Sequence, residues 1–191
     1  VLKRDSNLYM NVSFSQMVTL LEINANAKII AVDVNENVIV YGNDDFVERI
    51  KTNEGIIRTR YFLKRRKIQV KVRGKEPRAR LLGKYDEREW WRVREIYYKA
   101  AKEIIGRALE IGATVIVMED LEIYKRDLCS EELNGRIHRW SYRRFQRILE
   151  YQAKLHGLNV KYVDSAYTSK TVRCVKVGWI QARMGVNLED V

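Results

Sequence analysis

Two acidic residues stand at the ends of two apolar segments that lie far apart in the sequence. Asp33 follows the run "IIAV" at residues 29–32, and Glu119 follows "VIVM" at residues 115–118. Continuous apolar runs of this length are typical of strands buried on both faces of a sheet. If the two strands are parallel neighbours, their carboxylates lie side by side at the C-terminal edge, where ligand sites of open α/β sheets form.

Paired carboxylates at such an edge repel each other unless cations lie between them. Carboxylate oxygens are hard ligands that suit Mg²⁺ or Mn²⁺. Two such ions can activate water and stabilise the leaving oxygen when a phosphodiester bond is cleaved. The simpler interpretation stays open at this point, because an acid at a strand end often caps a helix or lies in a solvated turn.

The chain is strongly basic. Its 191 residues carry a formal net charge of +11, with a pI of about 9.7. This balance favours a polyanionic partner, above all nucleic acid, although a ribosome-like or merely soluble basic protein is an alternative. Two groups of basic side chains are candidates for nucleic-acid contacts: Lys64, Arg65, Arg66 and Lys67 in a basic segment at 58–84, and Arg143, Arg144 and Arg147 further on.

The two cysteines, Cys129 and Cys174, have no second Cys or His at metal-ligand spacing, so we do not expect a zinc site. No apolar run approaches the roughly 20 residues of a membrane span, and no signal peptide is recognised. We therefore expect reduced thiols in a cytoplasmic protein that has no membrane partner. One proline and abundant Lys, Arg and Glu are compatible with a thermophilic source.

The pattern of apolar residues predicts a mixed sheet flanked by helices. An early hairpin implies an antiparallel edge, and a later βαβ alternation implies parallel pairing. We expect strands at 7–15, 28–34, 38–42, 46–51, 114–118 and 159–165. We expect helices near 58–72, with a loop after it, at 86–111 between an Asp86 cap and Gly112, and from a Ser141 cap to His156, with Gly157 as the stop.

Trp90 and Trp91 begin the predicted long helix beside the basic segment. Aromatic rings next to cations can stack on unpaired bases. Packing in the core is the alternative, and we expect it for at least one of the two.

Three strings together resemble the RuvC-like nuclease domain of TnpB, an RNA-guided DNA nuclease of small insertion sequences that is related to compact type V CRISPR effectors. They are "IIAVDVNE", "VIVMEDL" and "LEYQAKLHGLNVKYVDSAYTSKT". The resemblance covers roughly residues 28–187. It implies an RNase H-like fold over 27–191, with a basic helical insertion at about 56–112. Residues 1–26 then resemble the end of the wedge β-barrel that precedes the nuclease domain in that family.

Carried over to this sequence, the resemblance makes Asp33 and Glu119 the first two metal-binding carboxylates of a transposon-associated DNA endonuclease. It implies Mg²⁺ or Mn²⁺ as cofactor, DNA as partner, and a guide RNA as a possible second partner.

The sequence departs from the family pattern at two places. Val172 and Val175 stand where the family has a Cys-x-x-Cys pair, which indicates that the zinc finger is lost. Gly185 stands where the third carboxylate is expected, and a glycine has no side chain to bind a metal. Asp164 and Asp190 are conceivable substitutes, although a turn or solvated surface is the simpler interpretation of both. A relative that binds nucleic acid without cutting it is therefore the alternative to an active nuclease.

Overall fold

The computed structural model describes residues 2–4, 7–10, 12–13, 15–24, 26–120, 135 and 139–164. The elements in chain order are β1 (Leu2–Arg4), β2 (Asn7–Tyr9), β3 (Lys28–Val34), β4 (Val38–Gly42), β5 (Val47–Lys51), α1 (Glu54–Lys71), α2 (Lys75–Glu110), β6 (Ala113–Asp120), α4 (Tyr142–Leu155) and β7 (Asn159–Asp164). The predictions that concern Cys129, Val172, Cys174, Val175, Gly185 and Asp190 lie outside the described residues.

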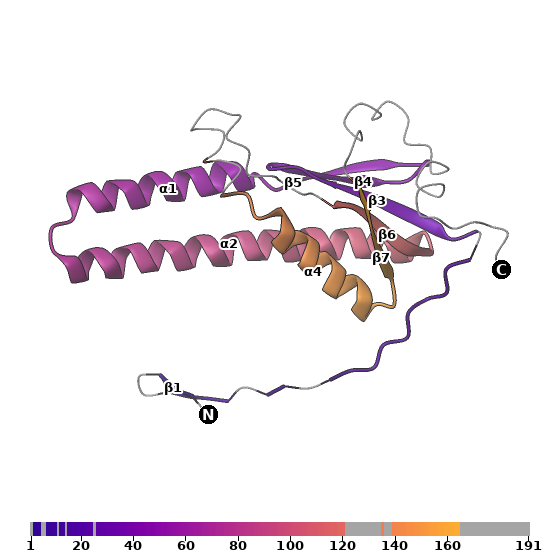
Figure 1. The fold of residues 1–191 in the computed structure, drawn as a ribbon, viewed down its shortest axis with the longest axis horizontal. Helices are drawn as coiled ribbons and strands as arrows, with labels where there is room; N and C mark the ends of the chain where they lie inside the picture. Colours follow the sequence, from indigo (N-terminus) through magenta and orange to yellow (C-terminus); the bar gives the residue numbers. More distant parts are fainter. Residues whose placement is uncertain are drawn as a thin grey trace.

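Five strands form a mixed sheet in the order β5-β4-β3-β6-β7. Strand β4 pairs antiparallel with both β3 and β5, whereas β6 pairs parallel with both β3 and β7. The predicted hairpin, third strand and βαβ alternation are therefore confirmed. Figure 1 shows α2 and α4 on the same side of this sheet.

The main core lies between the sheet and these two helices. Alternate residues of β3 and β6 point into it, and Ile30, Ile116 and Met118 are fully buried there. Phe145 and Leu149 of α4 are buried in the same cluster. Complete burial of such side chains contributes about 1.5–3 kcal/mol each, so this layer accounts for much of the fold's stability.

A smaller apolar cluster covers the opposite face of the sheet. It contains Ile29, Val115 and Val117, with Val163 packed against them. Both central strands are thus buried on two sides, which explains why their sequences are continuous apolar runs rather than alternating ones.

The helices α1 and α2 form a long hairpin whose closed end lies far from the sheet (Figure 1). The predicted loop before residue 86 is wrong, since α2 already begins at Lys75. Gly74, with φ +91°, makes the turn between the two helices. Pro77 lies in the first turn of α2, where a missing N–H removes no helical hydrogen bond.

The other predicted ends of the helices were partly right. Asp86 lies inside α2 and caps nothing; its carboxylate is 3.5 Å from the guanidinium of Arg65 instead. Gly112 (φ +68°) and Gly157 (φ +78°) follow α2 and α4 in the left-handed conformation that a helix stop requires, as expected. Ser141 does precede α4, but its hydroxyl makes no capping bond.

The predicted strand at 7–15 is shorter than expected. Among the described residues of this range, the regular part is β2, and it pairs with β1 rather than with the main sheet. An alternating strand needs a partner strand and an apolar layer, and the side chains of Met10 and Val12 are 72% and 67% exposed. The segment rejoins the domain at Leu21, whose amide donates to the carbonyl of Gly157 over 2.7 Å.

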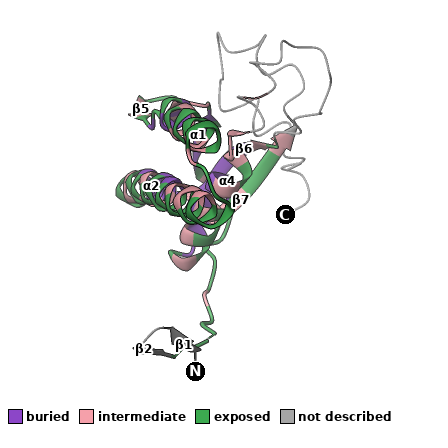
Figure 2. Cartoon of the chain, turned by 90° about the vertical axis from the view of Figure 1, so that its left-hand side faces the viewer, coloured by how far each residue is buried: buried purple, intermediate pink, exposed green. Residues whose placement is uncertain are grey.

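Exposed residues dominate the outward surfaces of the helical hairpin, and buried ones lie on its inner side (Figure 2). Within the described part of the chain, none of the helices combines the length and the apolar character that a bilayer span requires.

Candidate functional site

Asp33 and Glu119 stand at the same register level of two neighbouring parallel strands, β3 and β6. The paired residues of β3 and β6 run from Ile29 with Val115 to Val32 with Met118, and each acid is the following residue of its own strand. Neighbouring strands lie about 4.8 Å apart, and side chains at one register level of a parallel pair point to the same face. The fold thus brings together the two acids that the sequence singled out.

Both carboxylates lie on the face of the sheet opposite to α2 and α4. They continue the alternation of Ile29, Val115 and Val117, which form the smaller apolar cluster. Asp33 is exposed and Glu119 is partly buried. The pair therefore lies where the smaller apolar cluster ends and this face of the sheet becomes exposed to solvent.

Two amide side chains hold the backbone and the side chains around this pair. Asn35 Nδ2 donates to Asp33 Oδ2 over 2.8 Å. Gln146 of α4, which is 4% exposed, donates through Nε2 to the main-chain carbonyl of Glu119 over 2.7 Å. The second bond ties the end of β6 to the helix that follows it.

Asp120 belongs to the other face of the sheet. Its carboxylate is 4.0 Å from the guanidinium of Arg143, and it lines a small hollow with Arg143, Gln146, Arg147 and Tyr162. Burial, a hydrogen bond to Glu150 and the nearby charge of Asp120 raise the pKa of the Tyr162 hydroxyl well above its usual range. Asp120 is thus a neighbour of the candidate site that points away from Asp33.

A third acid does not join the pair within the described residues. Glu119 pairs with Val163 of β7, whereas Asp164 pairs with Asp120, one position beyond. The part of the chain that the structure describes holds no group of three or more His, Cys, Asp or Glu side chains suited to a metal ion.

The donor set of the pair fits a hard divalent cation. Two carboxylates at one register level, one of them open to solvent, offer oxygen ligands on the same side of the sheet. Mg²⁺ commonly uses one or two protein carboxylates and completes its octahedron with water and substrate oxygens. Asp33 and Glu119 therefore suit Mg²⁺ or Mn²⁺.

The first basic group lies on α1 and its members differ in surroundings. Lys64, Arg66 and Lys67 are exposed. Arg65 instead bonds to the carboxylate of Glu89 on α2 and is only 21% exposed. It already has a structural role as the ionic link between the two helices.

The second basic group lies on α4. Arg143 and Arg147 are exposed, and the guanidinium of Arg144 lies 5.3 Å from the ring centre of Trp90. Trp90 and Trp91 are 36% and 54% exposed and pack edge to face. The expectation that one of the two tryptophans is a core residue is therefore wrong, because both lie at the surface of α2.

A buried polar network links α1, α2 and the residue before α4, and it was not predicted. Glu54, which is 2% exposed, accepts from Arg58 Nε over 2.5 Å, from the Tyr97 hydroxyl, and from the Ser141 amide over 3.2 Å. Arg58 also donates to Glu89 Oε1 over 3.2 Å. The network fixes the start of α4, from which the second basic group projects.

Burial and the adjacent Glu54 carboxylate raise the pKa of the Tyr97 hydroxyl far above its usual range. Burial alone would lower the pKa of Arg58, but its neighbour Glu54 reverses this and raises it. Arg58 is therefore a permanent cation. The i,i+4 spacing of Glu54 and Arg58 was the only sequence signal of this network.

Known proteins resemble this chain in sequence. A family model described as the Cas12f1-like TNB domain matches residues 142–187. A TnpB-like protein of Methanocaldococcus jannaschii is 32% identical over 152 residues, which make up 74% of this chain and 54% of that protein. The chain thus spans about half the length of this relative.

Two cryo-EM structures share the fold. The Cas12f1–sgRNA–target DNA complex matches 78% of this chain and 39% of the solved one, with a TM-score of 0.55 and 24% identity. The CRISPR-Cas12f ternary complex matches 85% and 36%, with a TM-score of 0.59 and 21% identity.

The mixed five-stranded sheet with its helices matches the fold found in Cas12f structures. The chain is a TnpB-like relative of Cas12f and carries a segment of the Cas12f1-like TNB type, so the resemblance seen in the sequence is confirmed.

Proposed function

We propose that this chain is the RuvC-like, RNase H-type nuclease domain of a transposon-associated DNA endonuclease of the TnpB type, and that it hydrolyses DNA phosphodiester bonds. The observation that carries the proposal is the placement of Asp33 and Glu119 at one register level of two parallel strands. Carboxylates at that edge are suited to bind cations beside a phosphate.

The relatives support the choice of substrate. The Cas12f1 structure that shares this fold was solved with a guide RNA and target DNA. A chain with a net charge of +11 is suited to the same kind of partner, so we propose DNA as substrate and a guide RNA as further partner.

Asp33 and Glu119 would hold Mg²⁺ or Mn²⁺, which supplies an activated water and stabilises the charge of the leaving oxygen when bound. The remaining roles belong to the protein. Asn35 orients the carboxylate of Asp33, and Gln146 fixes the main chain at Glu119. Exposed cations at Arg143 and Arg147 are suited to hold the phosphates of the strand.

A second candidate function is nucleic-acid binding without cleavage. Gly185 stands at the sequence position where the family has its third carboxylate. Losing a metal ligand removes transition-state stabilisation that the ions supply, so cleavage would be slow or absent while binding persists.

The test is nicking of supercoiled plasmid by the purified chain with Mg²⁺ or Mn²⁺. We expect Asp33→Asn and Glu119→Gln each to lower the nicking rate about 100-fold or more, since each removes a charged metal ligand of the transition state. Asp45→Asn, an exposed acid in the turn between β4 and β5, removes the same charge and should leave the rate unchanged.

Calorimetric titration with Mn²⁺ in the absence of DNA separates the two candidate functions. If the unmodified chain binds Mn²⁺ but does not nick DNA, and Asp33→Asn abolishes the binding heat, the second candidate function is favoured. Nicking that is unaffected by either substitution would show that the cleavage site lies elsewhere.

A further inference from the structure

Aromatic and arginine side chains of α2 and α4 gather on one surface. We call it the aromatic–arginine surface and define it by Trp90, Trp91, Arg94, Tyr98, Arg144, Arg147 and Tyr151. The tryptophans, Arg94 and Tyr98 come from α2, and the other three residues come from α4. Arg94, Tyr98 and Tyr151 were not among the candidates from the sequence, although the i,i+4,i+8 spacing of Trp90, Arg94 and Tyr98 places them on one helical face.

Arg94 organises the α2 part of this surface. Its guanidinium carbon lies 4.9 Å from the ring centre of Trp90, 5.2 Å from Trp91 and 5.3 Å from Tyr98. Arg144 approaches Trp90 from α4 at 5.3 Å. Cation–π contacts of this length hold rings in fixed orientations, so a ligand that stacks on them loses little conformational entropy of the protein.

The rings of Trp91 and Tyr151 remain accessible to a ligand. Trp91 is 54% exposed and Tyr151 is 59% exposed. Such large exposed aromatic side chains, set among arginines, are unusual on a surface whose only role is to face water. They offer flat apolar faces beside positive charge.

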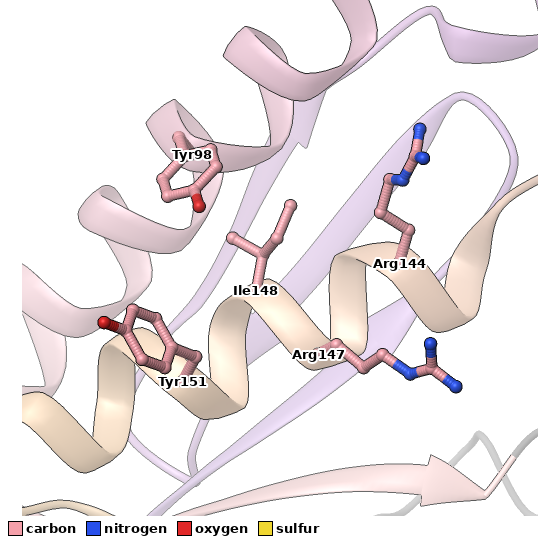
Figure 3. Close-up of a pocket in the computed structure, with 5 residues that line it drawn as sticks. All are labelled: Tyr98, Arg144, Arg147, Ile148 and Tyr151. Carbon is pink, nitrogen blue, oxygen red and sulfur yellow. The ribbon is translucent and has the colours of Figure 1, made fainter. Parts of the chain in front are cut away.

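The α4 part of the surface is hollowed. An open depression of about 320 Å³ is lined by Tyr98, Arg144, Arg147, Ile148 and Tyr151. Figure 3 shows the two tyrosine rings on one side of Ile148 and the two guanidinium groups on the other. Flat rings and phosphate-binding groups therefore lie a short distance apart.

Arg147 connects this depression to a second hollow near the end of β6. It lines the depression and also the smaller hollow that contains Asp120, the residue directly after Glu119. A chain of phosphates that follows the arginines of α4 is thus led toward the end of β6.

We propose that the aromatic–arginine surface binds an unpaired strand of nucleic acid, with bases stacked on Trp91 and Tyr151 and phosphates bound by Arg144 and Arg147. The bases of a duplex are stacked on one another, so their faces are not available to exposed rings, whereas an unpaired strand offers them. The inference rests on the proposed function only in that the ligand is a nucleic acid.

The experiment measures fluorescence anisotropy of a labelled oligothymidylate, an abasic oligomer of the same length, and a blunt duplex. We expect Trp91→Ala to weaken binding of the oligothymidylate about 5- to 100-fold, as loss of one base–aromatic stack does elsewhere. Binding of the abasic oligomer should not change, because it has the phosphates but no bases. Trp91→Phe should retain most of the affinity, and thermal melting of both variants shows whether the fold is intact.

Equal weakening for the oligothymidylate and the abasic oligomer, or no weakening at all, would overturn the proposal. So would sedimentation showing a dimer that Trp91→Ala dissociates while oligothymidylate binding is unchanged, since the surface would then bind a second copy of the chain. The measurements are made in the Asp33→Asn background. A failed nicking assay combined with a base-dependent Trp91 effect would reject the proposed function and leave this inference standing.

Discussion

At the scale of single residues, the most consequential feature is how the structure uses charged side chains that look alike in the sequence. Arg65 and Arg66 are neighbours in a basic run, yet the first is paired with Glu89 and the second is exposed. Glu89 and Glu95 are both glutamates of α2, yet the first is 5% exposed and the second pairs with Lys99 at the surface. Of these four side chains, Arg65 and Glu89 connect α1 with α2, whereas Arg66 and Glu95 are exposed to solvent.

We therefore expect Glu89→Gln to lower the free energy of unfolding by about 3 kcal/mol, because Arg58 and Arg65, both partly buried, each lose one of their two carboxylate partners. Glu95→Gln removes an exposed ion pair on the same helix and should cost no more than about 1 kcal/mol. Urea denaturation of the two variants measures the difference. Equal effects would mean that the Glu89 pairs are solvated in solution.

At the scale of elements, the turn between α1 and α2 determines where the charged groups of the hairpin lie. The hairpin reverses at Gly74, whose φ of +91° few side chains tolerate. An added Cβ would also lie 3.2 Å from Pro77 Cγ. Because α2 begins directly after this turn, Glu89 and Trp90 lie deep inside one continuous helix.

We expect Gly74→Ala to destabilise the protein by about 1 kcal/mol or more, since alanine is strained at positive φ. Gly83→Ala is the matched control: Gly83 lies inside α2, and an added Cβ there meets nothing within 4 Å. That variant should gain up to about 1 kcal/mol from its better helix propensity. Thermal melting compares the two, and a stabilising Gly74→Ala would contradict the turn conformation.

At the scale of the whole molecule, the sheet separates two kinds of surface. Asp33 and Glu119 lie on one face, while α2 and α4 cover the other and carry the tryptophans and arginines. The two surfaces approach each other near the end of β6, where Gln146 bonds to Glu119 and Arg147 lies beside Asp120. The closed end of the α1–α2 hairpin extends away from the sheet (Figure 1).

This charge distribution predicts how salt affects binding of duplex DNA by the chain. The logarithm of the affinity should fall linearly with the logarithm of salt concentration, because bound phosphates release counterions. Lys64→Gln together with Lys67→Gln should reduce the slope by about 1 for each phosphate contact that is lost.

Lys99→Gln together with Lys154→Gln removes the same charge from exposed positions on α2 and α4 and serves as the control. If this pair changes the slope as much as the α1 pair does, binding follows net charge alone and the basic run on α1 has no special role.

The sequence by itself determined the features that depend on local patterns. The apolar runs before Asp33 and Glu119 predicted the two central strands, and Gly112 and Gly157 predicted where two helices end. The acidic pair could be proposed because parallel strands that end in acids place them at one edge. The strings shared with TnpB added the family.

The tertiary structure decided what depends on contacts between distant segments. The helix through Pro77 and Gly83 was missed because its start is fixed by the turn at Gly74 and by packing against α1. Pro77 falls in the first turn, where proline is tolerated, and Gly83 costs only about 1 kcal/mol. The network around Glu54 and the stacking on Arg94 join residues from different helices or successive turns, and charge or aromatic content alone does not reveal which of them meet. The sequence thus determined which side chains are available, and packing decided which are structural supports and which face a ligand.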